Sequence, residues 1–258
     1  MSPVALVTGA ARGIGAATVR ELTRQGWQVV AVDAGTDDPA LPYGLGTTAE
    51  LDAVAAATGA EAVLADVRDV PALQRAVGIA NDRFGGLDAA LAVAGVIAGG
   101  VPAWQLDAAP ERAVIDIDLL GVMNLARVAV PALLARPEPR RGRFLAVASA
   151  AAGRGLPLLA AYCAAKAGVA GFIRALAAEL GPAGITANAV SPGSTDTPML
   201  AESARLYGLP RAQSFADQQP LHRLLDPAEV ANVLAFLAGP GSGAVTGAVI
   251  PVDGGLAL

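Results

Sequence analysis

Seven short apolar runs, separated by segments with helical character, constrain the fold of this chain more than any other feature. The runs are Val4–Val7, Gln28–Val32, Ala62–Ala65, Ala89–Val93, Phe144–Ala148, Thr186–Val190 and Ala248–Val252. Such alternation is typical of parallel strands joined by crossover helices. The runs are apolar at nearly every position, as expected for strands that are covered by helices on both faces. The sequence therefore predicts an α/β fold with a central parallel sheet.

The segments with helical character are Gly13–Gln25, Ala49–Thr58, Val70–Arg83, Pro110–Leu134, Leu158–Leu180 and Pro227–Ala238. Pro71 and Pro227 lie near helix starts, where a missing backbone N–H costs nothing, and Asp226 is placed to cap the last helix. A chain of 258 residues without a clear linker or composition break favours one core. We therefore expect a single domain over residues 1–258.

Charge and metal-ligand content exclude several classes of function. A net charge of −5 argues against nucleic acid as a partner, because phosphate binding needs clustered basic residues. The small cluster Arg140, Arg141 and Arg143 is interpreted as a solvated turn. With one cysteine, Cys163, and one histidine, His222, the chain has no internal disulfide and lacks the usual soft metal-ligand sets. We expect no metal site.

Hydropathy favours a cytoplasmic protein that is not embedded in a membrane. The longest uncharged stretch, Ala89–Trp104, is too short and too interrupted by glycine and proline to span a bilayer. The N-terminus has no basic segment and no signal-cleavage pattern. Hydrophobic residues make up 54% of the chain and charged residues only 16%, so part of the surface is expected to be covered in a homo-oligomer.

A glycine-rich turn, Thr8-Gly9-Ala10-Ala11-Arg12-Gly13-Ile14-Gly15, follows the first run and opens the first helix. Backbone N–H groups of such a turn can approach a pyrophosphate at the helix N-terminus. The second run is followed by Asp33, whose carboxylate can accept hydrogen bonds from an adenosine ribose and would repel a 2′-phosphate. Arg12 favours such a phosphate more weakly, so the sequence predicts NAD rather than NADP. The alternative is an ordinary glycine turn and an ordinary strand-end aspartate.

Tyr162 and Lys166 are spaced to lie on one face of a helix, one turn apart. A phenol, with a pKa near 10, becomes a better base beside a positive charge, so Tyr162 could move a proton to or from a substrate oxygen. Lys166 is the only lysine among 18 basic residues. A compact ammonium can contact ribose hydroxyls and Tyr162 where a planar guanidinium cannot. Ser149, at the carboxyl end of a strand, could donate to the same oxygen. The alternatives are a solvent-facing lysine and a loop serine.

Four motifs in order make the chain resemble the short-chain dehydrogenase/reductase family over essentially its whole length. They are Thr8-Gly9-x3-Gly13-x-Gly15, Asp66-Val67, Ser149 thirteen residues before Tyr162-x3-Lys166, and Pro192-Gly193 followed by Thr197-Pro198-Met199. The resemblance implies a single-domain Rossmann fold with a doubly wound, seven-stranded sheet. It also implies an NAD-linked oxidoreductase that interconverts a secondary alcohol and a carbonyl, assembled as a tetramer or dimer.

Residue roles follow from the same resemblance. The cofactor-binding residues that it implies are Gly9, Arg12, Gly13, Ile14 and Gly15 at the pyrophosphate turn, Asp33 at the ribose, Asp66 and Val67 at the adenine, Gly95 near the second ribose, and Pro192, Gly193, Thr195 and Thr197 at the nicotinamide. Tyr162 and Lys166 contact both cofactor and substrate, with Ser149 beside them. Residues 199–225 correspond to the variable substrate lid.

Two positions depart from the family pattern. Asp118 stands where the family usually has an asparagine that holds a water of the proton relay, and it is included among the candidate catalytic residues. Its charge near Lys166 would offset part of the effect of that lysine on Tyr162, so we expect the alkaline limb of the pH–rate profile to move upward. Val93 replaces a second asparagine, which removes a polar side chain from the cofactor site.

A long segment, Ala34–Thr48, separates the second run from the next helix, where short connections are usual. It resembles the insertion of the mycofactocin-associated, carveol-dehydrogenase-like subgroup. That resemblance implies a loop that covers the adenosine end of NAD, while an external redox carrier removes the electrons. Leu41, Tyr43 and Leu45 are predicted to pack over the adenine. The alternatives are an insertion without a role and an oligomer contact.

The expected substrate is a small apolar alcohol or ketone. This expectation comes from a set of apolar side chains near or within the lid, namely Trp104, Met199, Leu200, Tyr207, Leu209 and Phe215. The competing function is a catalytically silent dinucleotide-binding sensor or assembly subunit. A lid histidine, His222, is interpreted as either a substrate contact or a polar cap, and Cys163 as a packed helix residue.

Overall fold

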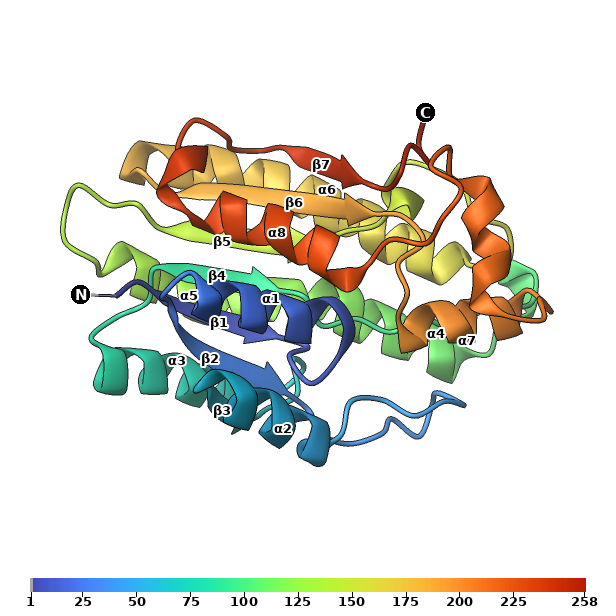
Figure 1. The fold of residues 1–258 in the computed structure, drawn as a ribbon, viewed down its shortest axis with the longest axis horizontal. Helices are drawn as coiled ribbons and strands as arrows, with labels where there is room; N and C mark the ends of the chain where they lie inside the picture. The colour runs from blue at the N-terminus through green and yellow to red at the C-terminus, as the bar shows by residue number, and fades with distance from the viewer. Residues whose placement is uncertain (1) are drawn as a thin grey trace.

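The computed structural model describes residues 2–258. Its seven strands form one parallel sheet in the order β3-β2-β1-β4-β5-β6-β7 (Figure 1). The strands are β1 (Val4–Thr8), β2 (Gln28–Asp33), β3 (Glu61–Leu64), β4 (Ala89–Ala92), β5 (Arg143–Val147), β6 (Thr186–Pro192) and β7 (Val249–Val252). Successive strands are added outward from β1 in one direction and from β4 in the other. The strand order therefore reverses between β1 and β4, where ligands bind in open α/β sheets.

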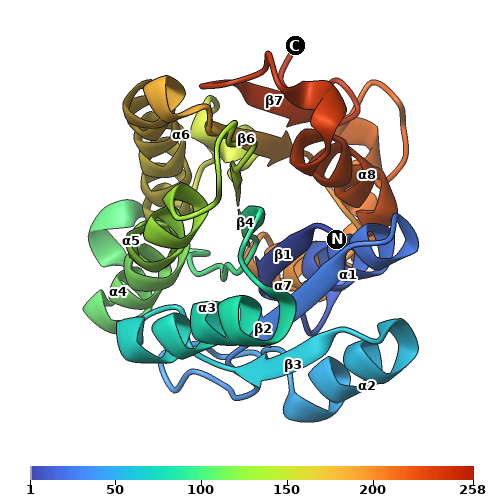
Figure 2. The ribbon, with the colours of Figure 1, turned by 90° about the vertical axis from the view of Figure 1, so that its left-hand side faces the viewer.

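Eight α-helices cover the two faces of the sheet within the described residues. They are α1 (Gly13–Arg24), α2 (Thr48–Thr58), α3 (Val70–Phe84), α4 (Ala108–Ile115), α5 (Gly121–Leu134), α6 (Ala160–Leu180), α7 (Pro198–Leu206) and α8 (Pro227–Ala238). Figure 2, in which the sheet is seen nearly end-on, places α3, α4, α5 and α6 on one face and α1, α2 and α8 on the other. The predicted doubly wound α/β fold is confirmed.

Alternation along the strands divides the apolar core between these two faces. Val4 and Leu6 of β1 belong to the core on the α3, α5 and α6 face, whereas Ala5 and Val7 belong to the core beneath α1 and α8. Because both faces are covered, every residue of β1 is buried. This explains why the strands lack a hydrophobic period of two.

The predicted helix Pro110–Leu134 is interrupted in the structure. A π-helical turn, Asp116–Leu120, lies between α4 and α5. Such turns are rare and often occur at functional sites. This one places Asp118 in the protein interior, with no exposed surface.

Three further expectations need correction. Arg143 is not part of a solvated turn, because it is a buried residue of β5 that donates to the carbonyl oxygens of Arg141 and Gly142. The predicted helix starting at Leu158 begins at Ala160, after Leu158 adopts a positive φ of 63°. The segment 199–225 contains α7 and a 3-10 helix, Ala212–Gln218, which the hydropathy pattern did not indicate.

Two helical stretches, Ala108–Leu134 and Ala160–Ala183, are long and apolar enough to cross a membrane by length and composition alone. Both pack on the sheet, where Leu125, Val169 and Ile173 are completely buried in the core. Their apolar character is therefore explained by packing within the protein.

Candidate active site

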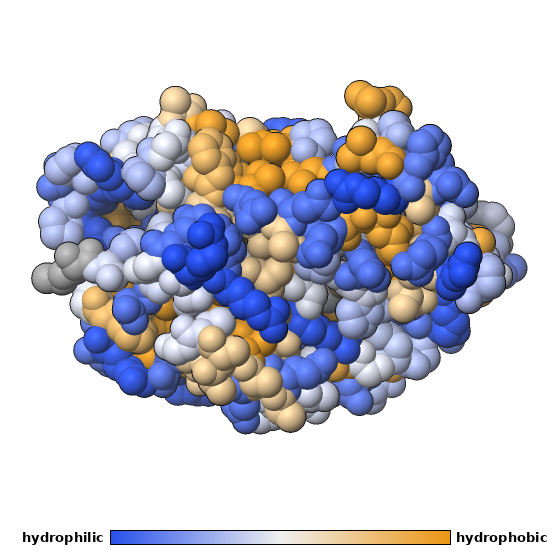
Figure 3. Space-filling model, in the orientation of Figure 1, coloured by the Kyte–Doolittle hydropathy of each residue, from blue (hydrophilic) through white to orange (hydrophobic). Residues whose placement is uncertain are grey.

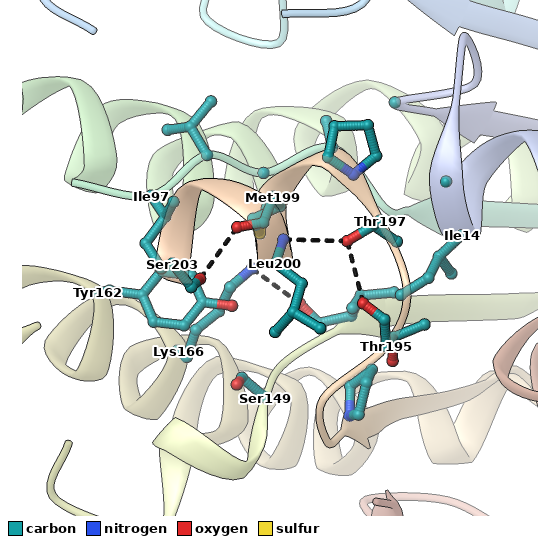
Figure 4. Close-up of a pocket in the computed structure, with 18 of the residues that line it drawn as sticks. Ile14, Ile97, Ser149, Tyr162, Lys166, Thr195, Thr197, Met199, Leu200 and Ser203 are labelled. Atoms are coloured by element: carbon teal, nitrogen blue, oxygen red, sulfur yellow. Dashed lines mark hydrogen bonds between the residues drawn. The ribbon is translucent and has the colours of Figure 1, made fainter. Parts of the chain in front are cut away.

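A cavity of about 580 Å³ lies at the carboxyl ends of the strands, within the size range typical of small-molecule sites. All residues predicted to bind the cofactor line it, namely Gly9, Arg12, Gly13, Ile14, Gly15, Asp33, Asp66, Val67, Gly95, Tyr162, Lys166, Pro192, Gly193, Thr195 and Thr197. Figure 4 shows part of this cavity, where residues from α6, α7 and the β6–α7 connection meet. The tertiary structure thus brings four separated motifs into one site.

The glycine turn leaves no room for a side chain at Gly9 or at Gly15. Gly9 has a φ of 69°, and a Cβ atom there would lie 2.7 Å from backbone atoms of Ala94. A Cβ on Gly15 would collide with the carbonyl of Gly9. Helix α1 starts at Gly13 without a side-chain cap and without an acidic residue in its first turn. Its first N–H groups therefore remain free to bind an anion.

Asp33 lies at the end of β2 beside this turn. Its Oδ2 accepts a hydrogen bond from the Ala11 N–H at 3.0 Å and its Oδ1 accepts one from the Gly35 N–H at 3.3 Å. These two backbone contacts fix the orientation of the carboxylate on the cavity wall. A carboxylate oxygen can accept more than one hydrogen bond, so the group can still receive ribose hydroxyls.

Ser149, Tyr162 and Lys166 converge at the other end of the cavity (Figure 4). Ser149 follows β5, whereas Tyr162 and Lys166 lie one turn apart on α6. The Nζ of Lys166 lies 5.6 Å from the centroid of the Tyr162 ring and donates to the Val147 carbonyl at 3.1 Å. Both side chains are largely buried, and the Ser149 hydroxyl accepts a hydrogen bond from the Ala151 N–H at 3.1 Å.

Burial raises the pKa of Tyr162, and this effect outweighs the opposing influence of the nearby Lys166 ammonium. Asp118 also raises that pKa, whereas the nearby Ser149 hydroxyl lowers it. In the protein without ligands the phenol is therefore protonated at neutral pH. This is the form that can donate a proton to a carbonyl oxygen.

Asp118 does not line the cavity and instead lies behind Lys166. Its Oδ2 is 3.1 Å from the Lys166 Nζ, and its Oδ1 accepts a hydrogen bond from the Val96 N–H at 2.7 Å. Burial raises the pKa of Asp118. Burial also disfavours the charged form of Lys166, but the adjacent carboxylate prevails and raises the pKa of that ammonium. The sequence placed Asp118 near Lys166, and the structure makes the two a buried ion pair.

The segment Ala34–Thr48 folds back across the dinucleotide end of the cavity. Arg12 donates from Nη2 to the Gly44 carbonyl at 2.6 Å, and the Tyr43 hydroxyl accepts a hydrogen bond from the Ile97 N–H at 2.9 Å. Tyr43 and Leu45 line the cavity, whereas Leu41 does not line it and packs into the protein core. The prediction for Leu41 is therefore wrong, because that side chain faces away from the cavity.

An ion-pair network that sequence reasoning missed holds this segment to the end of β3. Arg68 lies 2.6 Å from Asp38 within the segment and 2.6 Å from Asp66 after β3. Burial of Asp66 opposes its charge, but hydrogen bonds from Arg68 prevail and lower the pKa of its carboxyl group. The buried acid Asp38 is thereby paired. No sequence signal joins positions 38 and 68, which are brought together by the pairing of β2 with β3.

Pro192 and the residues after it form the part of the wall that adjoins the glycine turn, where a Cβ on Gly13 would lie 3.2 Å from Thr197. A Cβ on Gly193 would collide with the Gln219 side chain, so the backbone is tightly enclosed there. The Thr197 hydroxyl accepts a hydrogen bond from the Leu200 N–H at 3.3 Å and caps α7. This cap fixes the start of the lid beside the cofactor end of the cavity.

The remaining wall is mostly apolar and is built by the lid. Its lid residues are Met199, Leu200, Ser203, Tyr207, Leu209 and Phe215. The Tyr207 and Phe215 rings form an edge-to-face pair at 6.0 Å, and the Tyr207 hydroxyl donates to the Pro157 carbonyl at 2.7 Å. Trp104 was predicted to belong to this wall, but it is 84% exposed and lies outside the cavity. Neither His222 nor Cys163 lines the cavity, whereas Arg154, which the sequence did not single out, does.

Comparisons with known proteins agree with this geometry. A family model described as enoyl-(acyl carrier protein) reductase matches residues 9–257. The cis-4-hydroxycyclohexanecarboxylate dehydrogenase of Sinomonas cyclohexanicum is 40% identical over 98% of this chain and 95% of its own length. The (-)-trans-carveol dehydrogenase of Rhodococcus erythropolis is 36% identical over 99% of this chain and 97% of its own length.

A solved structure, carveol dehydrogenase from Mycobacterium avium in complex with NAD, is similar with a TM-score of 0.92 and 32% identity, covering 98% of this chain and 97% of that chain. Levodione reductase is similar with a TM-score of 0.88 and 30% identity, covering 99% and 97%. The motifs, the strand order and these matches agree. The chain therefore belongs to the short-chain dehydrogenase/reductase family.

Proposed function

We propose that this protein is an NAD-dependent alcohol dehydrogenase that interconverts a secondary alcohol and a ketone. The observation that carries the proposal is the convergence of Ser149, Tyr162 and Lys166 in the cavity that also contains the glycine turn and Asp33. Relatives named for hydroxycyclohexanecarboxylate and carveol oxidation support the reaction class. A silent binding subunit would not need this set of proton-transfer side chains.

The residues present fit NAD. The free N–H groups at the start of α1 and the close approach allowed by Gly9 suit a pyrophosphate. Asp33 is oriented by backbone contacts toward the position of an adenosine ribose, where a carboxylate disfavours a 2′-phosphate. The similar carveol dehydrogenase was solved with NAD and supports the same choice. When bound, NAD supplies the group that accepts or returns a hydride.

In alcohol oxidation, the Tyr162 phenolate accepts the hydroxyl proton of the substrate. Ser149, which lines the cavity with Tyr162, donates a hydrogen bond to the reacting oxygen and orients it. Lys166 stabilises the phenolate electrostatically and can donate to a ribose hydroxyl with its remaining N–H. In the reverse direction the protonated Tyr162 donates to the carbonyl oxygen. The apolar lid excludes water from this reaction.

A Tyr162→Phe variant tests the proposed reaction. It removes only the phenolic hydroxyl, so we expect alcohol oxidation to fall by at least about 100-fold, the usual scale of a lost general acid–base group. Purified protein is incubated with cyclic secondary alcohols, NAD and an artificial electron acceptor, and ketone formation is followed by gas chromatography. NAD binding, measured by calorimetry, should be unchanged. Undiminished ketone formation by the variant would exclude the assigned role.

We also propose that NAD remains bound between turnovers and passes its electrons to an external, mycofactocin-like redox carrier. The support is the segment Ala34–Thr48, which lies across the dinucleotide end and is held by the Arg12, Arg68 and Tyr43 contacts. Protein purified without added nucleotide should retain NAD through desalting, and added NAD alone should support little turnover. An apoprotein that turns over freely with added NAD would disprove this proposal.

Two further proposals concern the state of the protein in the cell. Large apolar side chains remain exposed, including Trp104, Leu64 and Phe236, and Figure 3 shows apolar patches near β7 and the C-terminus. Covering them in a homo-oligomer, a tetramer or a dimer, would explain the low charge content. The proposed location is the cytoplasm. Light scattering coupled to gel filtration gives the molar mass, and cell fractionation gives the location.

A further inference from the structure

Charged side chains are distributed unevenly along the walls of the cavity. The carboxylates that line it are Asp33, Asp37, Asp38 and Asp66, which all belong to the dinucleotide end. Within the described residues, no acidic side chain lines the lid end, where the wall is formed by apolar residues, Ser203 and Gln218. An anionic substrate group placed there would meet no like charge.

Four cationic side chains line the same cavity, and two of them, Arg68 and Lys166, are held in ion pairs. Arg68 is paired with two aspartates, Lys166 with Asp118, and Arg12 with the Gly44 carbonyl beside the glycine turn. The fourth, Arg154, makes no ion pair within residues 2–258. Its side chain is exposed and contacts one backbone carbonyl, and it follows Ser149 in the chain, whereas Arg12 lies in the glycine turn.

The backbone fixes the position of Arg154 relative to the reacting groups. Its N–H donates to the Ala150 carbonyl at 3.0 Å, within the turn that starts at Ser149. Its Nη1 donates to the Leu256 carbonyl, and Leu256 also lines the cavity. This contact uses one N–H of the guanidinium. The others remain able to form a bidentate contact with a planar anion.

We propose that Arg154 determines substrate specificity by binding a carboxylate carried on the apolar body of the substrate alcohol. This inference rests on the proposed function. The hydroxyl would lie at Ser149 and Tyr162, the hydrocarbon body against the lid residues, and the carboxylate at the guanidinium. The substrate class is thus a hydroxycycloalkane carboxylic acid or the corresponding oxo acid. One cation on an otherwise apolar wall suits one carboxylate, and the relative named for such a hydroxy acid is compatible with it.

A binding experiment separates this proposal from the reaction itself. Cyclohexanecarboxylate and the uncharged cyclohexanecarboxamide are titrated into NAD-loaded protein by calorimetry. We expect Arg154→Gln to weaken carboxylate binding by about 10-fold or more, as for loss of a charge-assisted hydrogen bond, and to leave carboxamide binding unchanged. Arg154→Lys should retain part of the affinity, because it keeps the charge without the planar fork. Arg75→Gln, an exposed substitution on α3 outside the cavity, is the matched control.

Turnover provides the second readout. For cis-4-hydroxycyclohexanecarboxylate, Arg154→Gln should raise KM by about 10-fold or more with a smaller change in kcat, whereas kinetics with cyclohexanol should not change. The proposal would be overturned if Arg154→Gln changed the kinetics of the hydroxy acid and of cyclohexanol equally, or changed neither. Weaker NAD binding by the variant would also overturn it. If the parent protein formed no ketone from cis-4-hydroxycyclohexanecarboxylate and none from cyclohexanol, the proposed function would be rejected. The calorimetric comparison of carboxylate and carboxamide binding would still decide the role of Arg154.

Discussion

Asp118 and Lys166 form a buried ion pair in which each charge depends on the other. Lys166 is 3% exposed and Asp118 is completely buried, so either charge alone would be costly to desolvate. The Asp118 carboxylate accepts a hydrogen bond from the Val96 N–H and lies 3.1 Å from the Lys166 ammonium. The ammonium also donates to the Val147 carbonyl. Asp118 therefore offsets part of the lowering effect that the Lys166 ammonium has on the pKa of Tyr162. We propose that Asp118 acts as a positioning residue for Lys166.

The variant Asp118→Asn tests this electrostatic role. Asp118 raises the pKa of Tyr162, so removing its charge should lower that pKa. Because oxidation requires the phenolate, kcat/KM for alcohol oxidation should begin to rise at lower pH in the variant than in the parent. The measurement is the pH dependence of kcat/KM. Asp116→Asn, on the same π-helical turn, is the charge-matched control. An unchanged profile, or the same change in both variants, would contradict the role.

Residue-level chemistry was largely readable from the sequence because the motifs are local. Tyr162 and Lys166 are one helical turn apart, and the glycine turn is contiguous. Arg154 gave no such signal, because an arginine between two glycines is typical of a solvated loop. Only the contact with Leu256, about a hundred positions later, places it on the cavity wall.

At the scale of elements, α8 begins with a complete capping box. Asp226 accepts a hydrogen bond from the Ala228 N–H at 2.8 Å, and Glu229 accepts one from the Asp226 N–H at 2.9 Å. A hydrogen bond from Arg223 holds the pKa of Glu229 at about 2, compared with an ordinary value of 4.5. The contribution of Glu229 to stability is therefore complete above pH 4.5 and is lost as the pH falls toward 2. The sequence predicted Asp226 as the N-cap, but not the part that Glu229 takes in the capping box.

Replacing the cap should lower stability without altering the active site. We expect Asp226→Ala to decrease the free energy of unfolding by about 1 kcal/mol, since the first N–H groups of α8 lose their acceptor. Urea denaturation followed by circular dichroism measures the change. Asp217→Ala, an exposed aspartate in the 3-10 helix, should be nearly neutral. A variant at position 226 as stable as the parent would show that the cap is energetically unimportant.

The interruption between α4 and α5 was not predictable in the same way. A single π turn leaves the apolar periodicity on both sides almost unchanged, so Pro110–Leu134 resembles one continuous helix in the sequence. The turn becomes evident only when Asp118 is placed against Val96 and Lys166. Helix α7 was not predictable either, because its buried residues, Glu202, Ser203 and Ala204, form no apolar periodic pattern.

At the scale of the whole molecule, the segment Ala34–Thr48 joins distant parts of the chain around the cavity. It contacts the start of α1 through Arg12, the end of β3 through Arg68 and the segment after β4 through Ile97. Under the proposal that this segment covers NAD, nucleotide exchange would require these contacts to open together. This gives the proposed retention of NAD a physical basis.

Tyr43 links this segment to the chain after β4, because its hydroxyl accepts a hydrogen bond from the Ile97 N–H. Tyr43→Ala removes both the ring and the hydrogen bond to Ile97, so we expect the variant to lose NAD faster than the parent during gel filtration. Tyr43→Phe keeps the ring and should show an intermediate rate. Bound NAD is quantified by chromatography of the denatured protein. Identical retention in all three proteins would mean that Tyr43 does not restrain the nucleotide.

The sequence by itself determined the parallel α/β fold, the strand limits to within a residue or two, the glycine turn and the pairing of Tyr162 with Lys166, while the other cofactor-site residues were implied by the family resemblance. These features depend on local periodicity, on glycine geometry and on fixed motif spacing. The tertiary structure alone decided the Asp118–Lys166 ion pair, the Arg68 network and the place of Arg154 on the substrate wall. Each of these joins residues from different strand–helix units, and their proximity depends on strand order and register. The physical reason is that electrostatic and packing contacts act over a few ångströms in space, whatever the separation of the residues along the chain.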